Sequence, residues 1–191
     1  KEGSIGRPLP GTEIEVRSLD RPEQTMPLGE KGEVCIRGPQ VMPGYWQNET
    51  ATAETFVDGW LRTGDVGYQD EDGYTFLVDR LKDVILCSGY NVYPRAIEEA
   101  LYLHDQIAEV TCIGVPDQYR GQAPKAFVRL KDGVTDVTAQ DLRAFLDDKI
   151  SRIEMPREIE IRDELPKTMV GKLSKKELVE EERQKREENT A

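Results

Sequence analysis

The chain has 191 residues, enough for one medium-sized domain or two small ones, with 26 Lys and Arg residues against 37 Asp and Glu residues. The resulting net charge of −11, with no dense basic run, argues against nucleic acid or an anionic membrane surface as a partner. No apolar run reaches the ~20 residues of a transmembrane helix, and nothing resembles a signal peptide, so we expect no transmembrane segment and a cytoplasmic location.

The first part of the chain reads as short strands joined by turns rich in Pro and Gly. Residues 12–17 and 32–38 alternate apolar and polar side chains, the pattern of a half-buried strand. Asn48 is a good N-cap for a short helix over residues 49–56. A further strand is predicted over residues 74–78. This composition favours a small barrel or a curled sheet.

The remainder of the chain alternates between strands and helices, which favours a compact α/β sandwich. Two of the helices begin after capping residues, Thr138 and Ser174. The predicted strands cover residues 84–86, 107–115, 126–130 and 158–161, and the predicted helices cover residues 94–104, 138–150 and 175–188.

The change of pattern predicts a mixed α and β protein of two parts. Residues 1–79 form the small β-rich, barrel-like part, and residues 83–191 form the α/β sandwich. Residues 80–82 connect the two.

Cysteine and histidine do not form a pattern that predicts a metal site. Cys35, Cys87 and Cys112 are widely spaced and lack a CxxC pair, and Cys35 and Cys112 sit in apolar runs typical of buried thiols. His104 is the one histidine, and its place at the end of a predicted helix favours a structural role. We therefore predict no metal ligands in this chain.

Three groups of residues are each weak signals alone and strong together. The strings are Asp58-Gly59-Trp60-Leu61-Arg62-Thr63-Gly64-Asp65, then Asp79-Arg80-Leu81-Lys82-Asp83 with Ser88-Gly89-Tyr90-Asn91-Val92-Tyr93-Pro94, and finally Pro166-Lys167-Thr168-Met169-Val170-Gly171-Lys172. Read alone, Thr-Gly-Asp in the first string is a common turn. In this order and at these separations, the strings resemble three late motifs of the adenylate-forming superfamily. Their residues are most similar to those of fatty-acid CoA ligases. The resemblance covers essentially the whole chain.

The resemblance implies an ATP-dependent acid–thiol ligase that joins a carboxylate to AMP and then passes the acyl group to CoA. Asp65 is expected to accept hydrogen bonds from the ribose hydroxyls of AMP, a task that suits a carboxylate because charge-assisted bonds are strong. Arg80 is expected to reach the same ribose. Lys172 is the candidate catalytic residue, because an ammonium group offsets the repulsion between the attacking carboxylate and the α-phosphate. Gly171 lets the backbone of its loop approach closely.

The same resemblance makes Lys82 the hinge of a mobile C-terminal domain. Rotation there would exchange an adenylation pose, with Lys172 at the AMP site, for a thioester-forming pose. The second pose would present Ser88, Gly89 and Tyr90, which are expected to line the path of the CoA pantetheine. Glu98 also matches a recurrent acidic position, although a solvated helix face explains it nearly as well.

The resemblance also implies what is missing or different. The phosphate-binding loop, the Mg²⁺-binding motif and most of the acyl pocket would lie upstream of Lys1, so we expect a fragment that needs the N-terminal domain of its parent and is inactive alone. Leu86 occupies a position that carries lysine in some luciferase-like members, which favours plain thioester formation.

Two alternatives to a fatty acyl-CoA synthetase using ATP, Mg²⁺ and CoA stay open. One is a fatty-acyl-AMP ligase, or another adenylating enzyme, that delivers its acyl group to a carrier protein. The other is a non-catalytic module that keeps the fold. The presence of Asp65, Arg80 and Lys172 speaks against the module. Chain length of the acid and oligomeric state do not follow from the sequence.

Overall fold

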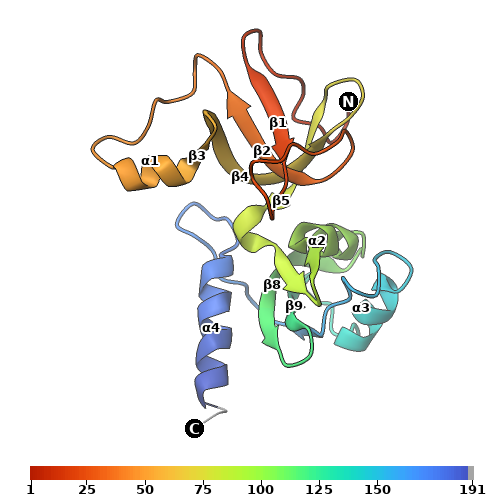
Figure 1. Ribbon diagram of the computed structural model, residues 1–191. Coiled ribbons are helices and arrows are strands. Elements are labelled where there is room, and N and C mark those ends of the chain that lie inside the picture. The colour runs from red at the N-terminus through yellow and green to blue at the C-terminus, as the bar shows by residue number, and fades with distance from the viewer. Residues whose placement is uncertain (189–191) are drawn as a thin grey trace. The chain divides into compact units, whose positions relative to one another are not determined.

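The computed structural model describes residues 1–188 and divides the chain into two compact units (Figure 1). Unit 1 comprises residues 1–82, and unit 2 begins at Asp83. The boundary directly follows Lys82, which lies in a short 3₁₀ turn, η1 (Leu81–Asp83).

Unit 1 is a five-stranded antiparallel sheet with one short helix. The strand order is β1-β2-β4-β3, and β5 pairs with β4. The elements are β1 (Glu13–Arg17), β2 (Gly32–Arg37), α1 (Glu49–Thr55), β3 (Phe56–Val57), β4 (Trp60–Gln69) and β5 (Thr75–Arg80).

Two irregularities give this sheet its curvature. The register shifts between β2 and β4 at Glu33/Cys35, and between β4 and β5 at Val66/Gly67. A bulge adds a residue to one strand, which bends the strand and increases its twist. At Gly67 a Cβ atom would lie 2.4 Å from the carbonyl oxygen of Phe76, so only glycine allows this close pairing. The curled sheet predicted from the sequence is confirmed.

The sequence did not predict β4, the longest strand of the unit. The segment Thr63–Asp65, taken alone as a turn, lies inside this strand. The cause is tertiary: β4 pairs with β2 on one side and with β3 and β5 on the other, which fixes it in spite of two glycines. Gly64 absorbs a positive φ of 72° within the strand.

The α1 helix begins where its cap predicts. The side chain of Asn48 accepts a hydrogen bond of 3.0 Å from the backbone N–H of Ala51, which satisfies one of the open donors of the first turn. The helix ends at Thr55, one residue before its predicted end.

Unit 2 is built around a second five-stranded sheet. Its strand order is β10-β9-β6-β7, and β8 pairs with β9; the β9–β10 pair is parallel and the others are antiparallel. The elements are β6 (Ile85–Cys87), β7 (Tyr90–Val92), α2 (Pro94–Tyr102), β8 (Ile107–Asp117), β9 (Gly121–Leu130), α3 (Ala139–Leu146), β10 (Glu158–Ile161) and α4 (Lys175–Glu188).

Helices cover this sheet on both faces (Figure 1). Side chains of a strand alternate between faces, so from Val110 to Val115 the even-numbered and odd-numbered residues of β8 enter different cores. Val110 packs with the apolar faces of α2 and α3, including Ile97 and Leu142. Ile113 packs with Phe127 of β9, with Leu165 and with Leu178, the one buried residue of α4. The predicted α/β sandwich is confirmed.

Some predicted boundaries were wrong by a few residues. The helix predicted to reach His104 ends at Tyr102. The helix predicted through Ile150 ends at Leu146, where two aspartates follow and an unfavourable charge meets the C-terminal end of the helix dipole. Strand β9 begins at Gly121, five residues before its predicted start, because it pairs with β8 over its whole length.

The burial predicted for Cys35 and Cys112 is confirmed. Cys35, Cys87 and Cys112 are free and buried, and burial raises the pKa of the Cys35 thiol to about 11. His104 stacks edge-on against Phe145, with ring centroids 4.8 Å apart. Over residues 1–188, no group of His, Cys, Asp and Glu could hold a metal ion, and no helix is long and apolar enough to cross a membrane.

Candidate functional site

Unit 1 places two of the predicted residues side by side. Asp65 of β4 and Arg80 of β5 are direct partners in the antiparallel register, and Nε of Arg80 lies 3.0 Å from Oδ1 of Asp65. The arginine side chain is 63% exposed and the aspartate side chain 29% exposed. The pair therefore presents a partly exposed carboxylate and an exposed guanidinium together on paired strands.

A buried glutamate, which the sequence analysis missed, supports Asp65. Glu33 of β2 is 2% exposed, and its carboxylate accepts hydrogen bonds from Nε of Arg62 at 2.8 Å and from the backbone N–H of Gly64 at 3.2 Å. The hydroxyl of Thr63 donates to the carbonyl oxygen of Val34 and accepts from the N–H of Asp65. These bonds fix the backbone just before the candidate ribose contact.

The predicted hinge follows directly after this pair. Asp79 is 8% exposed, and its side chain accepts a hydrogen bond of 2.8 Å from the backbone N–H of Arg80. Two residues later, Lys82 is exposed in η1 at the boundary of the two units. A short turn with an exposed side chain is the kind of segment that absorbs a φ/ψ change without breaking a core.

Unit 2 groups the three candidate CoA contacts in one tight hairpin. Ser88 and Gly89 join β6 to β7 with positive φ angles of 52° and 81°. All three candidates are exposed, and Tyr90 is 66% exposed. A Cβ atom on Gly89 would meet nothing within 4 Å inside the described chain, so its backbone conformation, not crowding, calls for glycine here.

A second turn lies beside this hairpin. The backbone N–H of Ser88 donates to the carbonyl oxygen of Arg120 at 2.8 Å. Asp117 caps the second turn by accepting from the N–H groups of Arg120 and Tyr119, bonds that with Arg157 hold the pKa of Asp117 below its usual range. The two turns are thus hydrogen-bonded to each other at an exposed edge of unit 2.

Lys172 lies in a different loop of unit 2. Lys167 and Leu173 form an isolated antiparallel bridge that closes the loop, and the N–H of Thr168 donates to the carbonyl oxygen of Lys172 at 2.7 Å. Gly171 completes the turn with a φ of 79°. The Lys172 side chain is exposed and makes no ion pair with any residue in the range 1–188. An ammonium group held this way is available for a bound anion.

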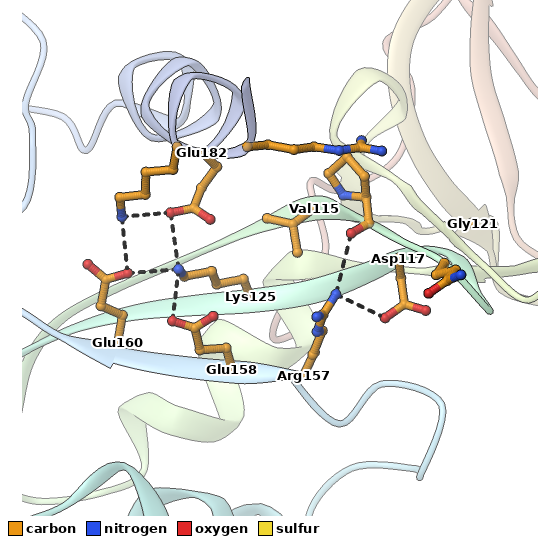
Figure 2. Close-up of a pocket in the computed structure, with 12 residues that line it drawn as sticks. Val115, Asp117, Gly121, Lys125, Arg157, Glu158, Glu160 and Glu182 are labelled. Atoms are coloured by element: carbon orange, nitrogen blue, oxygen red, sulfur yellow. Dashed lines mark hydrogen bonds and ion pairs between the residues drawn. The ribbon is translucent and has the colours of Figure 1, made fainter. Parts of the chain in front are cut away.

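A polar pocket of unit 2 contains none of the predicted residues (Figure 2). Lys125 of β9 is buried there, and its ammonium lies 2.8–3.0 Å from the carboxylates of Glu158, Glu160 and Glu182. Burial lowers the pKa of Lys125, but these hydrogen bonds outweigh burial and raise it. Because the central charge is fully paired, we interpret the cluster as the attachment of α4 to β9 and β10.

Comparison with known proteins places the chain in a family. Residues 1–46 match the family described as AMP-binding enzyme, and residues 96–172 match the AMP-binding enzyme C-terminal domain. The chain belongs to the AMP-binding enzyme family.

Relatives in this family carry a specific description. The chain is 48% identical to a long-chain-fatty-acid–CoA ligase of Bacillus subtilis over 95% of its own length and 32% of the relative. It is 45% identical to the ligase of the same description from Escherichia coli over 96% of its length and 32% of that relative. It therefore spans about a third of the length of these curated relatives.

Solved structures show the same fold with several acceptors and ligands. ATP-bound MatB from Rhodopseudomonas palustris superimposes with a TM-score of 0.87 at 32% identity, covering 94% of this chain and 35% of that one. The o-succinylbenzoate CoA synthetase of Bacillus subtilis, in complex with its acyl-adenylate intermediate, gives 0.83 at 34% identity, covering 93% and 36%. The amide bond synthetase McbA of Marinactinospora thermotolerans gives 0.83 at 40% identity, covering 93% and 35%.

Proposed function

We propose that this chain is the C-terminal portion of an ATP-dependent acyl-CoA synthetase that acts on medium- or long-chain fatty acids. Unit 1 would complete the large AMP-binding domain, and unit 2 would be its mobile C-terminal domain. The main observation behind the proposal is Lys172, which is exposed on a closed loop and has no ion pair with residues 1–188, in a chain that also presents the Asp65–Arg80 pair.

The nucleotide contacts follow from the chemistry of that pair. Asp65 can accept from both ribose hydroxyls of AMP, and charge-assisted hydrogen bonds of this kind are about twice as strong as neutral ones. Arg80 is already oriented toward the same point by its contact with Asp65. When ATP is bound, Mg²⁺ would neutralise its phosphates; its ligands are expected outside the described residues, which hold no suitable cluster.

Lys172 would serve the first half-reaction. A carboxylate oxygen attacks the α-phosphorus, the new C–O–P bond forms, and pyrophosphate leaves. Because both reactants are anions, the ammonium of Lys172 stabilises the charge that gathers between them. The exposed side chain is free to do this because it has no ion pair of its own in the described chain.

The second half-reaction would use the exposed hairpin of unit 2. The thiol of CoA attacks the acyl carbon, and AMP leaves. The hairpin of Ser88, Gly89 and Tyr90 is fixed by strand pairing and is exposed, as a surface that guides a flexible pantetheine arm must be. Rotation at Lys82 would bring first the Lys172 loop and then this hairpin to the adenylate.

The acceptor is the least constrained part of the proposal. The long-chain ligase relatives favour a fatty acid and CoA. McbA, by contrast, is an amide bond synthetase on the same fold, so the fold alone does not select a thiol. Delivery to a carrier protein is the second candidate.

The test is a pair of assays on the full-length parent, with carboxylates of increasing chain length. ATP–pyrophosphate exchange reports adenylation, and CoA-thioester formation reports transfer. We expect both, with a preference for medium or long chains, and neither from the 191-residue chain alone. Exchange without CoA thioester would support the carrier-protein reading, and no exchange with any acid would refute the proposal.

A further inference from the structure

Both ends of the Lys172 loop are held by lysine–glutamate pairs. At the entrance, Nζ of Lys167 lies 2.6 Å from Oε1 of Glu109. Just after the exit, Nζ of Lys175 lies 2.9 Å from Oε1 of Glu98. Lys172 lies between the two paired lysines and has no such partner in the described chain. Of these three lysines, Lys167 and Lys175 anchor the loop through ion pairs, whereas the ammonium group of Lys172 has no ion pair in the described chain.

The two carboxylates stand on the rigid part of unit 2. Glu98 belongs to α2, and its Oε1 also accepts a hydrogen bond of 2.8 Å from the backbone N–H of Cys112 on β8. Glu98 is therefore not a member of a solvated helix face, as one reading of the sequence had it; its side chain is 17% exposed. It connects α2, β8 and the start of α4.

Glu109 depends on Lys167 for its one short contact. Its Oε2 atom is buried and has no hydrogen-bond partner among residues 1–188, and Nε of Arg129 lies 3.6 Å away, beyond good hydrogen-bond geometry. The side chain is 21% exposed. Without Lys167 this mostly buried carboxylate would keep only the longer ion pair with Arg129, which is a costly loss, so the pairing fixes where Lys167 lies.

The loop between the anchors is short and internally bonded. The N–H of Gly171 donates to the carbonyl oxygen of Thr168 at 2.8 Å, and the N–H of Ser174 donates to the carbonyl oxygen of Pro166 at 2.8 Å. Because these hydrogen bonds leave the backbone of the loop few free torsions, a shift of Lys167 should also shift Lys172. The tip, Met169 and Val170, is fully or largely exposed and adds no anchor of its own.

We propose that Glu109 and Glu98 are positioning residues for Lys172, acting through Lys167 and Lys175. This inference rests on the proposed role of Lys172 in adenylation. Catalysis by a placed charge is sensitive to distance, and a misplacement of ~1 Å can cost as much as ~10²-fold in rate. We call the Glu109–Lys167 and Glu98–Lys175 pairs the clamp. The clamp would therefore act on the adenylation half-reaction and not on thioester formation.

The test compares Glu109→Gln, Lys167→Met and their double variant in the full-length parent. We expect pyrophosphate exchange to fall roughly tenfold in each single variant and no further in the double variant, because both remove one interaction. Lys167→Arg keeps the charge and should retain most of the rate. Lys131→Met is the control: it removes an exposed lysine charge just beyond β9, at a residue without an ion pair in the described chain.

Two readouts separate positioning from stability. Thioester formation from supplied acyl-AMP should be unchanged; an equal loss in both half-reactions would assign Glu109 to the stability of unit 2 and overturn the proposal. Unchanged exchange in Glu109→Gln would overturn it as well. Glu98→Gln should have the smaller effect, because a glutamine oxygen can still accept from Cys112.

A third readout does not need activity. In the 191-residue chain, amide hydrogen exchange at Thr168 and Gly171 should become faster in Glu109→Gln, since both amides bond within the loop. If the wild-type parent shows no pyrophosphate exchange, the proposed function fails, and this experiment still decides the clamp. Unchanged protection at both amides would refute it.

Discussion

The two units differ in how they hold their candidate residues. In unit 1, Asp65 and Arg80 oppose each other in paired strands, above a buried glutamate. In unit 2, Lys172 and the Ser88–Gly89 pair lie in turns, and the sheet of this unit is packed with apolar side chains on both faces. The proposed ribose contact needs side chains in fixed positions. The proposed role of Lys172 needs a charge that moves to and from the nucleotide, which suits a loop on a domain with its own core.

The cores of the two units also differ in how much charge they bury. Unit 1 buries charged Arg17, Glu33 and Asp79 among a few apolar residues, whereas unit 2 has two apolar clusters, one on each face of its sheet. Unit 2 should therefore be the more stable and the more independent of the two.

The largest expected effect is on the core of unit 2. Phe127→Ala removes a fully buried ring and should lower the free energy of unfolding of unit 2 by ~3–5 kcal/mol. Both tryptophans, Trp46 and Trp60, belong to unit 1, so tryptophan fluorescence follows unit 1 and far-UV circular dichroism follows mainly the helices of unit 2. We expect the dichroism transition to move to lower denaturant and the fluorescence transition to stay. Equal shifts would show that the units unfold together.

Next comes the buried carboxylate of unit 1. Glu33→Gln weakens the contacts to Arg62 and to the N–H of Gly64, and should cost ~2 kcal/mol, read from the fluorescence transition. Glu13→Gln is the matched control, because Glu13 pairs with Arg37 in the same sheet while 59% exposed. It should change stability little. Similar losses in the two variants would contradict the role given to Glu33.

Low pH should weaken the ion-pair cluster around Lys125 that attaches α4 to β9 and β10. Burial raises the pKa of Glu160, but hydrogen bonds from Lys125 and Arg162 outweigh burial and hold it at about 2, against an ordinary value of 4.5. A lowered folded-state pKa gives stability that is complete above pH 4.5 and is lost as the pH falls through about 2. Unit 2 should therefore weaken over this window. Glu160→Gln should flatten the dependence; an unchanged slope would refute this account.

The smallest effects concern the helix caps. Thr138 forms a capping box with Asp141 at the start of α3, and Thr138→Ala should cost ~1 kcal/mol. Asn48→Ala removes a similar cap from α1, which has no buried residue, and should leave the unfolding transition of unit 1 almost unchanged. Both can be measured by urea denaturation. The reverse order would mean that α1 contributes more to its unit than its burial indicates.

Local signals in the sequence predicted much of the fold. The caps at Asn48 and Thr138 and the strand over residues 158–161 depend on neighbours in the chain, and they were right. Strand β4 was missed because pairing with distant strands, not its own residues, makes it a strand.

Sequence motifs identified the candidate residues, but no motif identified the glutamates that hold those residues in place. Glu33, Glu98 and Glu109 each lie in a segment whose pattern places a charged residue toward solvent, and the structure buries or half-buries them against partners 14 to 77 positions away. Burial of a charge depends on those partners, which no local pattern reveals. The pairing of Asp65 with Arg80 likewise required the register of β4 and β5.

The central claim is that Lys172 serves adenylation and not thioester formation. The most direct measurement is Lys172→Ala in the full-length parent, with the two half-reactions followed separately. The account predicts that pyrophosphate exchange falls by ~10²–10³ while CoA thioester still forms from supplied acyl-AMP. Normal exchange in the variant would contradict it.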